Sequence, residues 1–152
     1  MTEQVKQKRE YKSFTFKCST EWTGKRTWVA RTGSAPAIEG GSPPEFKGEE
    51  GRWSSEHLLL ASVNSCHIAS FISYSSRKGF EFASLESEIE GLLERDGTTY
   101  RYTKMIIRPR ITVKSGEDVE TARQYMHRAH ELCFMSSSVN AEVIVEPEII
   151  VA

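Results

Sequence analysis

The hydrophobic positions change their spacing along the chain, and each spacing predicts a different element. From Tyr11 to Trp22 apolar and polar residues partly alternate, as they do in a strand. Thr27 to Arg31 fits the returning strand after a turn at residues 23–25. Glycine and proline gather between Thr32 and Arg52 and the periodicity fades, so we expect a long surface connection there.

Two later stretches have helical spacing. Ser54 to Lys78 predicts a long helix, with serines that can cap its start and Gly79 to end it. Its apolar and small residues cover nearly the whole circumference, which indicates a buried helix. Glu117 to Leu132 predicts a second helix with one apolar face, which Cys133 continues.

A hairpin is predicted between the two helices. Two long strands over residues 80–95 and 98–114 meet at Asp96-Gly97, a strong signal for a tight turn. Pro109 predicts an edge or a bulge late in the second strand. Residues 141–151 close the chain as a strand. The order β-β-α-β-β-α-β, without βαβ repetition, indicates an α+β fold with a largely antiparallel sheet.

The first predicted helix also bears on assembly. About 25 residues form a helix about 37 Å long. One sheet layer from a single chain of 152 residues is too small to cover a helix of that length that is apolar all round. We therefore expect an obligate homodimer, with a second copy lying against this helix.

Composition and charge narrow the classes of partner. The chain has the length and the 38% hydrophobic content of one globular domain, over residues 1–152. Its 20 basic and 21 acidic side chains, with no run of like charge, argue against binding of nucleic acid or anionic lipid. No apolar run reaches the ~20 residues of a membrane span. The polar residues 1–12 lack a signal-peptide pattern, so we expect a flexible extension and a cytoplasmic protein.

Three cysteines, at positions 18, 66 and 133, carry the candidate chemistry. In a reducing compartment each can be a small buried hydrophobe, which is the simplest interpretation and the one expected for Cys18 in its strand. A redox pair is the second interpretation: a thiolate attacks the O–O bond of a peroxide, and a second cysteine then condenses with the resulting sulfenic acid. Such a thiolate needs a nearby cation, because burial alone raises its pKa.

A zinc site is the third interpretation. His127, His130 and Cys133 fall three residues apart, and His57 and His67 lie on the other predicted helix. Steps of three residues drift around a helix by about 60° each, and no CxxC or HExxH pair accompanies the set. The sequence therefore favours no metal and no cofactor.

Two cysteine elements resemble the OsmC/Ohr family. The first runs from Pro43-Pro44-Glu45-Phe46-Lys47-Gly48 to WSSEHLLLASVNSC, which ends at Cys66. It is similar to the family's SPE-x-LL-x-A-x-x-x-C element, which opens the central helix. The second, AHELC ending at Cys133, is similar to the family's second cysteine element. The resemblance spans about residue 22 to the C-terminus.

The resemblance implies an OsmC-like α+β fold, with antiparallel sheets around two central helices in an intertwined homodimer. It also implies a thiol-dependent peroxidase that reduces organic hydroperoxides and is restored by an external dithiol. On this mapping Cys66 is the peroxidatic cysteine and Cys133 the resolving one. Glu56 matches the family glutamate ten positions before the first cysteine, and Arg26 is the best match to its arginine, with Arg31 as the alternative.

Helix geometry adds a condition to this mapping. Ten helical residues place Glu56 and Cys66 about 15 Å apart, so they cannot share one hydrogen-bonded arginine within a single helix. We therefore expect a composite site, in which Glu56 and Arg26 meet a Cys66 across a dimer axis.

Departures from the family pattern keep a second function open. Ser55 and Phe134 stand where proline is typical, and we expect Phe134 to be packed. The alternative to a peroxidase is a non-enzymatic OsmC-like protein that binds a small ligand or serves in stress, with structural cysteines.

Overall fold

The computed structural model describes residues 11–152, and its internal contacts divide into two compact units, Met1–Ser54 and Ser55–Ala152. Each unit is described by itself. The single domain expected over residues 1–152 stays a prediction. Most of the extension expected over residues 1–12 lies outside the described residues.

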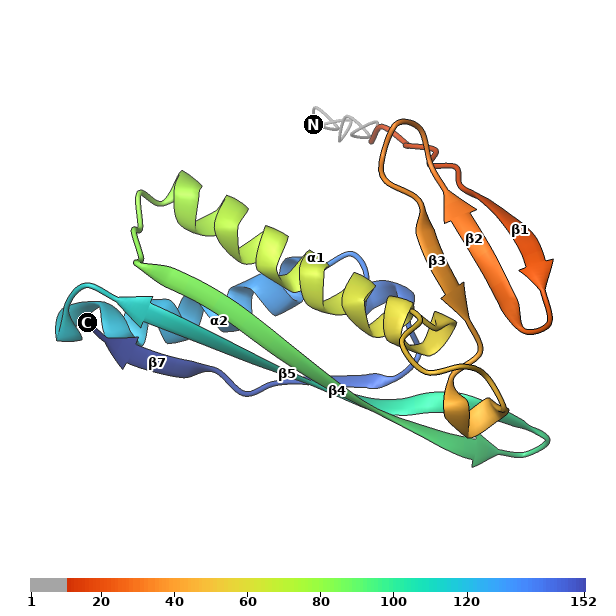
Figure 1. Cartoon of the computed structure of the whole chain (residues 1–152). Helices are drawn as coiled ribbons and strands as arrows, with labels where there is room; N and C mark the ends of the chain where they lie inside the picture. The colour runs from red at the N-terminus through yellow and green to blue at the C-terminus, as the bar shows by residue number, and fades with distance from the viewer. Residues whose placement is uncertain (1–10) are drawn as a thin grey trace, which may run out of the picture. The chain divides into compact units, whose positions relative to one another are not determined.

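The N-terminal unit holds a three-stranded antiparallel sheet in the order β1-β2-β3 (Figure 1). The strands are β1 (Ser19–Gly24), β2 (Thr27–Arg31) and β3 (Ile38–Gly41), and a 3-10 turn, η1 (Pro44–Phe46), follows them. The predicted turn is confirmed: Lys25 adopts φ 47° between β1 and β2. The third strand, by contrast, lies inside the stretch that we expected to be a connection.

The early strand is shorter than predicted. Residues 11–18 form no strand, and Phe14 and Phe16 are 77% and 92% exposed. Cys18 is exposed as well, so its predicted packing inside a strand is wrong. Partial alternation alone does not supply the neighbouring strand that a sheet ladder needs, and the Lys17 carbonyl instead accepts a hydrogen bond from the Thr32 hydroxyl.

The C-terminal unit combines two helices with a four-stranded mixed sheet (Figure 1). Its elements are α1 (Ser55–Arg77), β4 (Ser84–Asp96), β5 (Thr99–Val113), η2 (Gly116–Asp118), α2 (Val119–Leu132), η3 (Ser136–Ser138), β6 (Glu142–Val145) and β7 (Glu148–Val151). β4 pairs antiparallel with β5, as the hairpin signal predicts, and β6 and β7 pair parallel with β5. The α+β class is therefore confirmed, with parallel pairing beside the antiparallel hairpin.

Pro109 lies in the central strand β5, so the predicted edge or bulge is wrong. A proline has no N–H to give to a sheet ladder. The partner edge is interrupted at this point: β6 pairs through Ile107 and β7 pairs from Arg110, with Pro147 in the gap. Because no strand hydrogen bond is needed there, proline is accommodated, and the single closing strand that we expected is divided into two.

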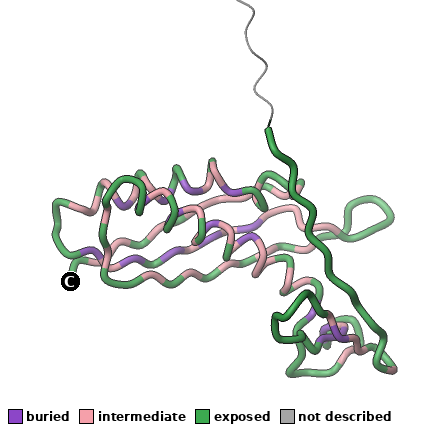
Figure 2. The backbone as a smooth tube through the Cα atoms, turned by 90° about the horizontal axis from the view of Figure 1, so that it is seen from above, coloured by how far each residue is buried: buried purple, intermediate pink, exposed green. Residues whose placement is uncertain are grey.

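Two apolar clusters hold the helices to the sheet. One joins α1 and α2 to one end of the sheet through Phe71, Ile111 and Met126, all fully buried. The other places Val63 of α1 against Met105 and Ile107 of β5. Figure 2 shows buried positions recurring along the helices and strands of this unit. The buried face predicted for α2 is confirmed.

α1 is buried along one stripe only. Its buried residues fall four apart, at Val63, His67, Phe71 and Ser75, whereas Ile72 is 48% exposed. The burial on all sides that the sequence indicates is therefore absent within one chain. No helix among residues 11–152 is long and apolar enough to cross a membrane.

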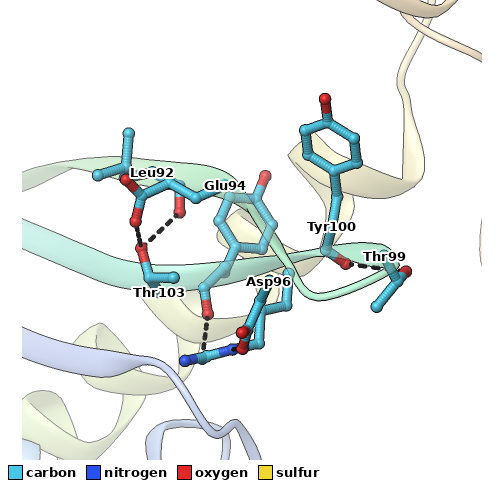
Figure 3. Close-up of polar contacts among 8 residues, drawn as sticks. Leu92, Glu94, Asp96, Thr99, Tyr100 and Thr103 are labelled. Carbon is cyan, nitrogen blue, oxygen red and sulfur yellow. Dashed lines mark hydrogen bonds and ion pairs between the residues drawn. The ribbon is translucent and has the colours of Figure 1, made fainter.

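The turn end of the β4–β5 hairpin, next to Asp96, is held by polar contacts (Figure 3). Thr103 donates to the Glu94 carboxylate and the Leu92 carbonyl, and Arg101 binds the Asp96 carboxylate. The pairing register shifts by one residue between Leu92 and Leu93, where the sequence pattern also slips. Further along the hairpin, the exposed carboxylates of Glu90 and Glu86 pair with Arg108 and Arg110 of β5.

Candidate active site

The fold brings two of the three cysteines together. Cys66 lies in the middle of α1 and is partly exposed, and Cys133 caps the C-terminus of α2 and is 2% exposed. The Cys133 Sγ atom lies 3.9 Å from the Val63 carbonyl oxygen, one turn before Cys66 on α1. The two thiols are within hydrogen-bonding reach of each other, and both are free. The predicted pair is therefore adjacent although 67 residues separate its members (133 − 66).

The pKa values of the two thiols are shifted in opposite directions. Burial raises the pKa of Cys66, yet this pKa lies below its ordinary value because four groups donate hydrogen bonds to the sulfur. They are the N–H of Met135, the thiol of Cys133, the N–H of Phe134 and the hydroxyl of Ser70. Cys66 is thus the thiol better suited to lose its proton.

Cys133 has the opposite environment. Burial raises its pKa, the neighbouring Cys66 raises it further, and hydrogen bonds from Ser136 lower it only in part. The Ser136 N–H lies 3.4 Å from the Cys133 sulfur. Cys133 therefore keeps its proton and can donate it to Cys66.

Apart from Cys133, the donors to Cys66 were not among the predicted site residues. Two of them are backbone N–H groups in the segment that follows α2, which no residue type identifies. Ser70 was open to detection, because it stands four positions after Cys66 on the same helical face. Phe134 is 75% exposed and borders Cys66, so its predicted packing is wrong.

Cys66 opens onto a concavity of about 510 Å³, which we call the Cys66 groove. Ser70, Ser73 and Arg77 continue the α1 side of it, and Leu132 and Phe134 form the other side. A small molecule can therefore reach the sulfur from solvent, between a polar helix face and an apolar wall.

Glu56 and Arg26, the other two predicted site residues, do not meet Cys66 within the units that hold them. Glu56 is in the first turn of α1 and lines a separate cavity of about 620 Å³, together with Tyr100, Arg101 and Tyr102. The Tyr102 hydroxyl donates to the Glu56 carbonyl oxygen at 3.0 Å, and burial followed by the Glu56 charge raises the Tyr102 pKa. Arg26 is exposed in the β1–β2 turn of the N-terminal unit.

The histidines considered for zinc differ in their surroundings. His67 is fully buried, with Nε2 3.0 Å from the Met126 carbonyl oxygen, whereas His127 is exposed. No group of three or more His, Cys, Asp or Glu side chains in the described part of the chain is arranged to hold a metal ion.

In the C-terminal unit a mixed sheet carries two helices, and two neighbouring cysteines with opposite pKa shifts lie between those helices. The sequence model of the OsmC-like proteins matches residues 48–148, so the chain belongs to the OsmC-like family. The resemblance found in the two cysteine elements is thereby confirmed.

Individual relatives are distant. The uncharacterized protein YmaD of Bacillus subtilis is 27% identical over 137 residues, which is 88% of this chain and 91% of YmaD. An OsmC-like protein of unknown function from Vibrio cholerae superposes with a TM-score of 0.80 at 21% identity, covering 89% of this chain and 99% of that one. The organic hydroperoxide resistance protein OhrB of Bacillus subtilis gives 0.65 at 20% identity, covering 90% and 98%. These similarities establish the fold.

Proposed function

We propose that this protein is a thiol-dependent peroxidase that reduces organic hydroperoxides. The observation that carries the proposal is the polarised pair: a thiol of lowered pKa at an open groove, in reach of a second thiol of raised pKa. Membership of a family that includes proteins named for organic hydroperoxide resistance supports the choice of substrate.

The reaction runs in three steps. The Cys66 thiolate attacks the outer oxygen of R–O–OH, the O–O bond breaks, and the departing alkoxide takes a proton to leave as an alcohol, so that Cys66 becomes a sulfenic acid. The Cys133 sulfur then attacks the Cys66 sulfur, which forms a disulfide and releases water. An external dithiol reduces that disulfide by exchange and is itself oxidised to a disulfide.

The proposed working unit is a homodimer of single OsmC-like domains in the cytoplasm, where a dithiol reductant is maintained. α1 leaves apolar side chains exposed, among them Leu59 and Ile72, which give a second copy apolar surface to cover. In that assembly Arg26 and Glu56 of one copy add a guanidinium to the Cys66 site of the other. Sedimentation as a monomer at micromolar concentration would contradict the dimer.

Three single variants test the peroxidase. Consumption of cumene hydroperoxide with dithiothreitol should be lost in Cys66→Ser and unchanged in Cys18→Ser, which removes an exposed thiol outside the pair. After one equivalent of peroxide, the wild type should lose two hydrogen atoms by mass and show a Cys66–Cys133 disulfide. In Cys133→Ser the same treatment should add oxygen to Cys66.

The outcomes separate the two functions that the sequence left open. Turnover retained in Cys66→Ser rejects the proposed chemistry. Thiols that stay reduced under peroxide, in protein that is folded, identify a non-enzymatic ligand-binding protein with structural cysteines.

A further inference from the structure

One face of α1 carries both the Cys66 thiol and a cationic side chain, that of Arg77. Cys66, Ser70, Ser73 and Arg77 follow the spacing i, i+4, i+7 and i+11, so they lie on one side of the helix. All four line the Cys66 groove, with Arg77 at the end away from the sulfur. The groove therefore has a nucleophile at one end, hydroxyls between, and a guanidinium at the other.

Arg77 differs from most arginines of the C-terminal unit in its partners. Among the described residues of that unit, Arg101, Arg108 and Arg110 each bind a carboxylate of the β-hairpin, and Arg123 and Arg128 each bind one on α2. No carboxylate pairs with Arg77 in the described part of the chain. Its guanidinium carbon lies 5.8 Å from the centre of the Tyr74 ring, a contact that leaves its N–H donors available.

The opposite wall of the groove suits a hydrocarbon. Leu132 and the exposed Phe134 lie there, and Ala69 adds an apolar position on α1. The eleven residues from Cys66 to Arg77 separate their Cα atoms by about 16 Å, and helical side chains lean toward the N-terminus, which brings the guanidinium back toward the sulfur. The apolar side of the groove, between these two ends, is therefore the place for the hydrocarbon part of a ligand.

We propose that Arg77 is a specificity residue that selects hydroperoxides carrying a carboxylate. The carboxylate binds the planar guanidinium, the hydrocarbon lies along Leu132 and Phe134, and the peroxide group reaches Cys66. This assignment rests on the proposed peroxidase function for its reaction, but not for its binding site. Arg77 acts on binding and takes no part in breaking the O–O bond.

Arg77 also lies in the last turn of α1, where a positive charge complements the helix dipole. A matched variant separates this electrostatic role from ligand binding. Lys78 places the same charge one residue further on and also lies over Tyr74, but it does not line the groove. Arg77→Gln and Lys78→Gln therefore change the charge at the helix end equally, and only the first changes the groove.

Binding of oleate and of methyl oleate, both below their micelle concentrations, is measured by calorimetry on the wild type and the two variants. Arg77→Gln should weaken oleate binding about tenfold, the size expected for one charge-assisted pair at an open site. It should leave methyl oleate unchanged, and Lys78→Gln should leave both ligands within about twofold. Equal weakening of acid and ester by Arg77→Gln, or equal weakening of oleate by both variants, overturns the proposal.

Kinetics with linoleic acid hydroperoxide and its methyl ester give a second reading. Arg77→Gln should raise KM for the acid, with kcat and the ester kinetics unchanged. If the wild type turns over neither peroxide, the peroxidase proposal fails, whereas the oleate comparison still decides whether Arg77 binds a carboxylate.

Discussion

At pH values below the Cys66 pKa, removing one hydrogen-bond donor from the Cys66 sulfur should slow the reaction of this thiol with electrophiles. Ser70→Ala deletes the hydroxyl donor and leaves the donors from Met135, Phe134 and Cys133 in place. A hydrogen bond to a charged group contributes about 1.5–3 kcal/mol. Because the Ser70 contribution is the weakest of the four, we take about 1 kcal/mol, which corresponds to about fivefold less thiolate.

The rate should change less than the thiolate population. A thiolate that loses a hydrogen bond becomes more nucleophilic, with a Brønsted coefficient of about 0.4–0.5. This recovers about half of the loss on a logarithmic scale, so the net effect at neutral pH is a decrease of about two- to threefold. At a pH where Cys66 is fully ionised in both proteins, only the nucleophilicity of the thiolate differs, so Ser70→Ala should react about twofold faster than the wild type.

The assay is alkylation by iodoacetamide as a function of pH, followed by mass at Cys66 in a Cys18→Ser background. Cys133 reacts slowly in this range because its pKa is raised and it is buried. Ser73→Ala is the matched control, since Ser73 lines the same groove without bonding the sulfur. The reasoning is refuted if Ser70→Ala follows the wild-type profile, or if Ser73→Ala slows the reaction equally.

Two further predictions concern stability, both measured by urea unfolding. Met126→Ala should lower the free energy of unfolding by about 2–5 kcal/mol because the side chain is fully buried, and Gln124→Ala, at an exposed position, should stay within about 0.5 kcal/mol; equal effects would contradict the assigned core. The folded-state pKa of His67 is lowered by burial below its ordinary value of 6.5, so the unfolded chain binds the extra proton as the pH falls. Stability should therefore decrease below about pH 6.5, by at most about 1.4 kcal/mol per pH unit, and His67→Gln should flatten this dependence.

The helices and the hairpin could be predicted because their signals are local. The 3.6-residue period and the Asp96-Gly97 turn locate α1, α2, β4 and β5 within a few residues. The first strand failed because alternation does not say whether a partner strand exists: Phe14 and Phe16 alternate correctly and are exposed. The last strand is divided where Pro147 falls between the two runs that pair with β5, next to Pro109, and the two prolines are 38 residues apart in the chain (147 − 109).

The two cysteines of the candidate site could be predicted, because thiol chemistry depends on residue type. Cys66 and Cys133 were identified from their two sequence elements, and the fold places them together. The groups that lower the Cys66 pKa include the N–H of Phe134 and of Met135, and every residue except proline carries such a group. Their contribution depends on where the chain turns after α2, which the sequence pattern does not specify.

The residues from Cys133 to Met135, at and after the end of α2, contribute to the candidate site in two ways. Cys133 supplies the second sulfur, and the next two residues supply the N–H groups that stabilise charge on the first. Any displacement of this segment that brings Cys133 into a bond with Cys66 also moves the donors that lower the Cys66 pKa. In the proposed reaction, this one short segment therefore influences both the pKa of the attacking thiol and the position of the second sulfur, so a substitution there is expected to change both properties together.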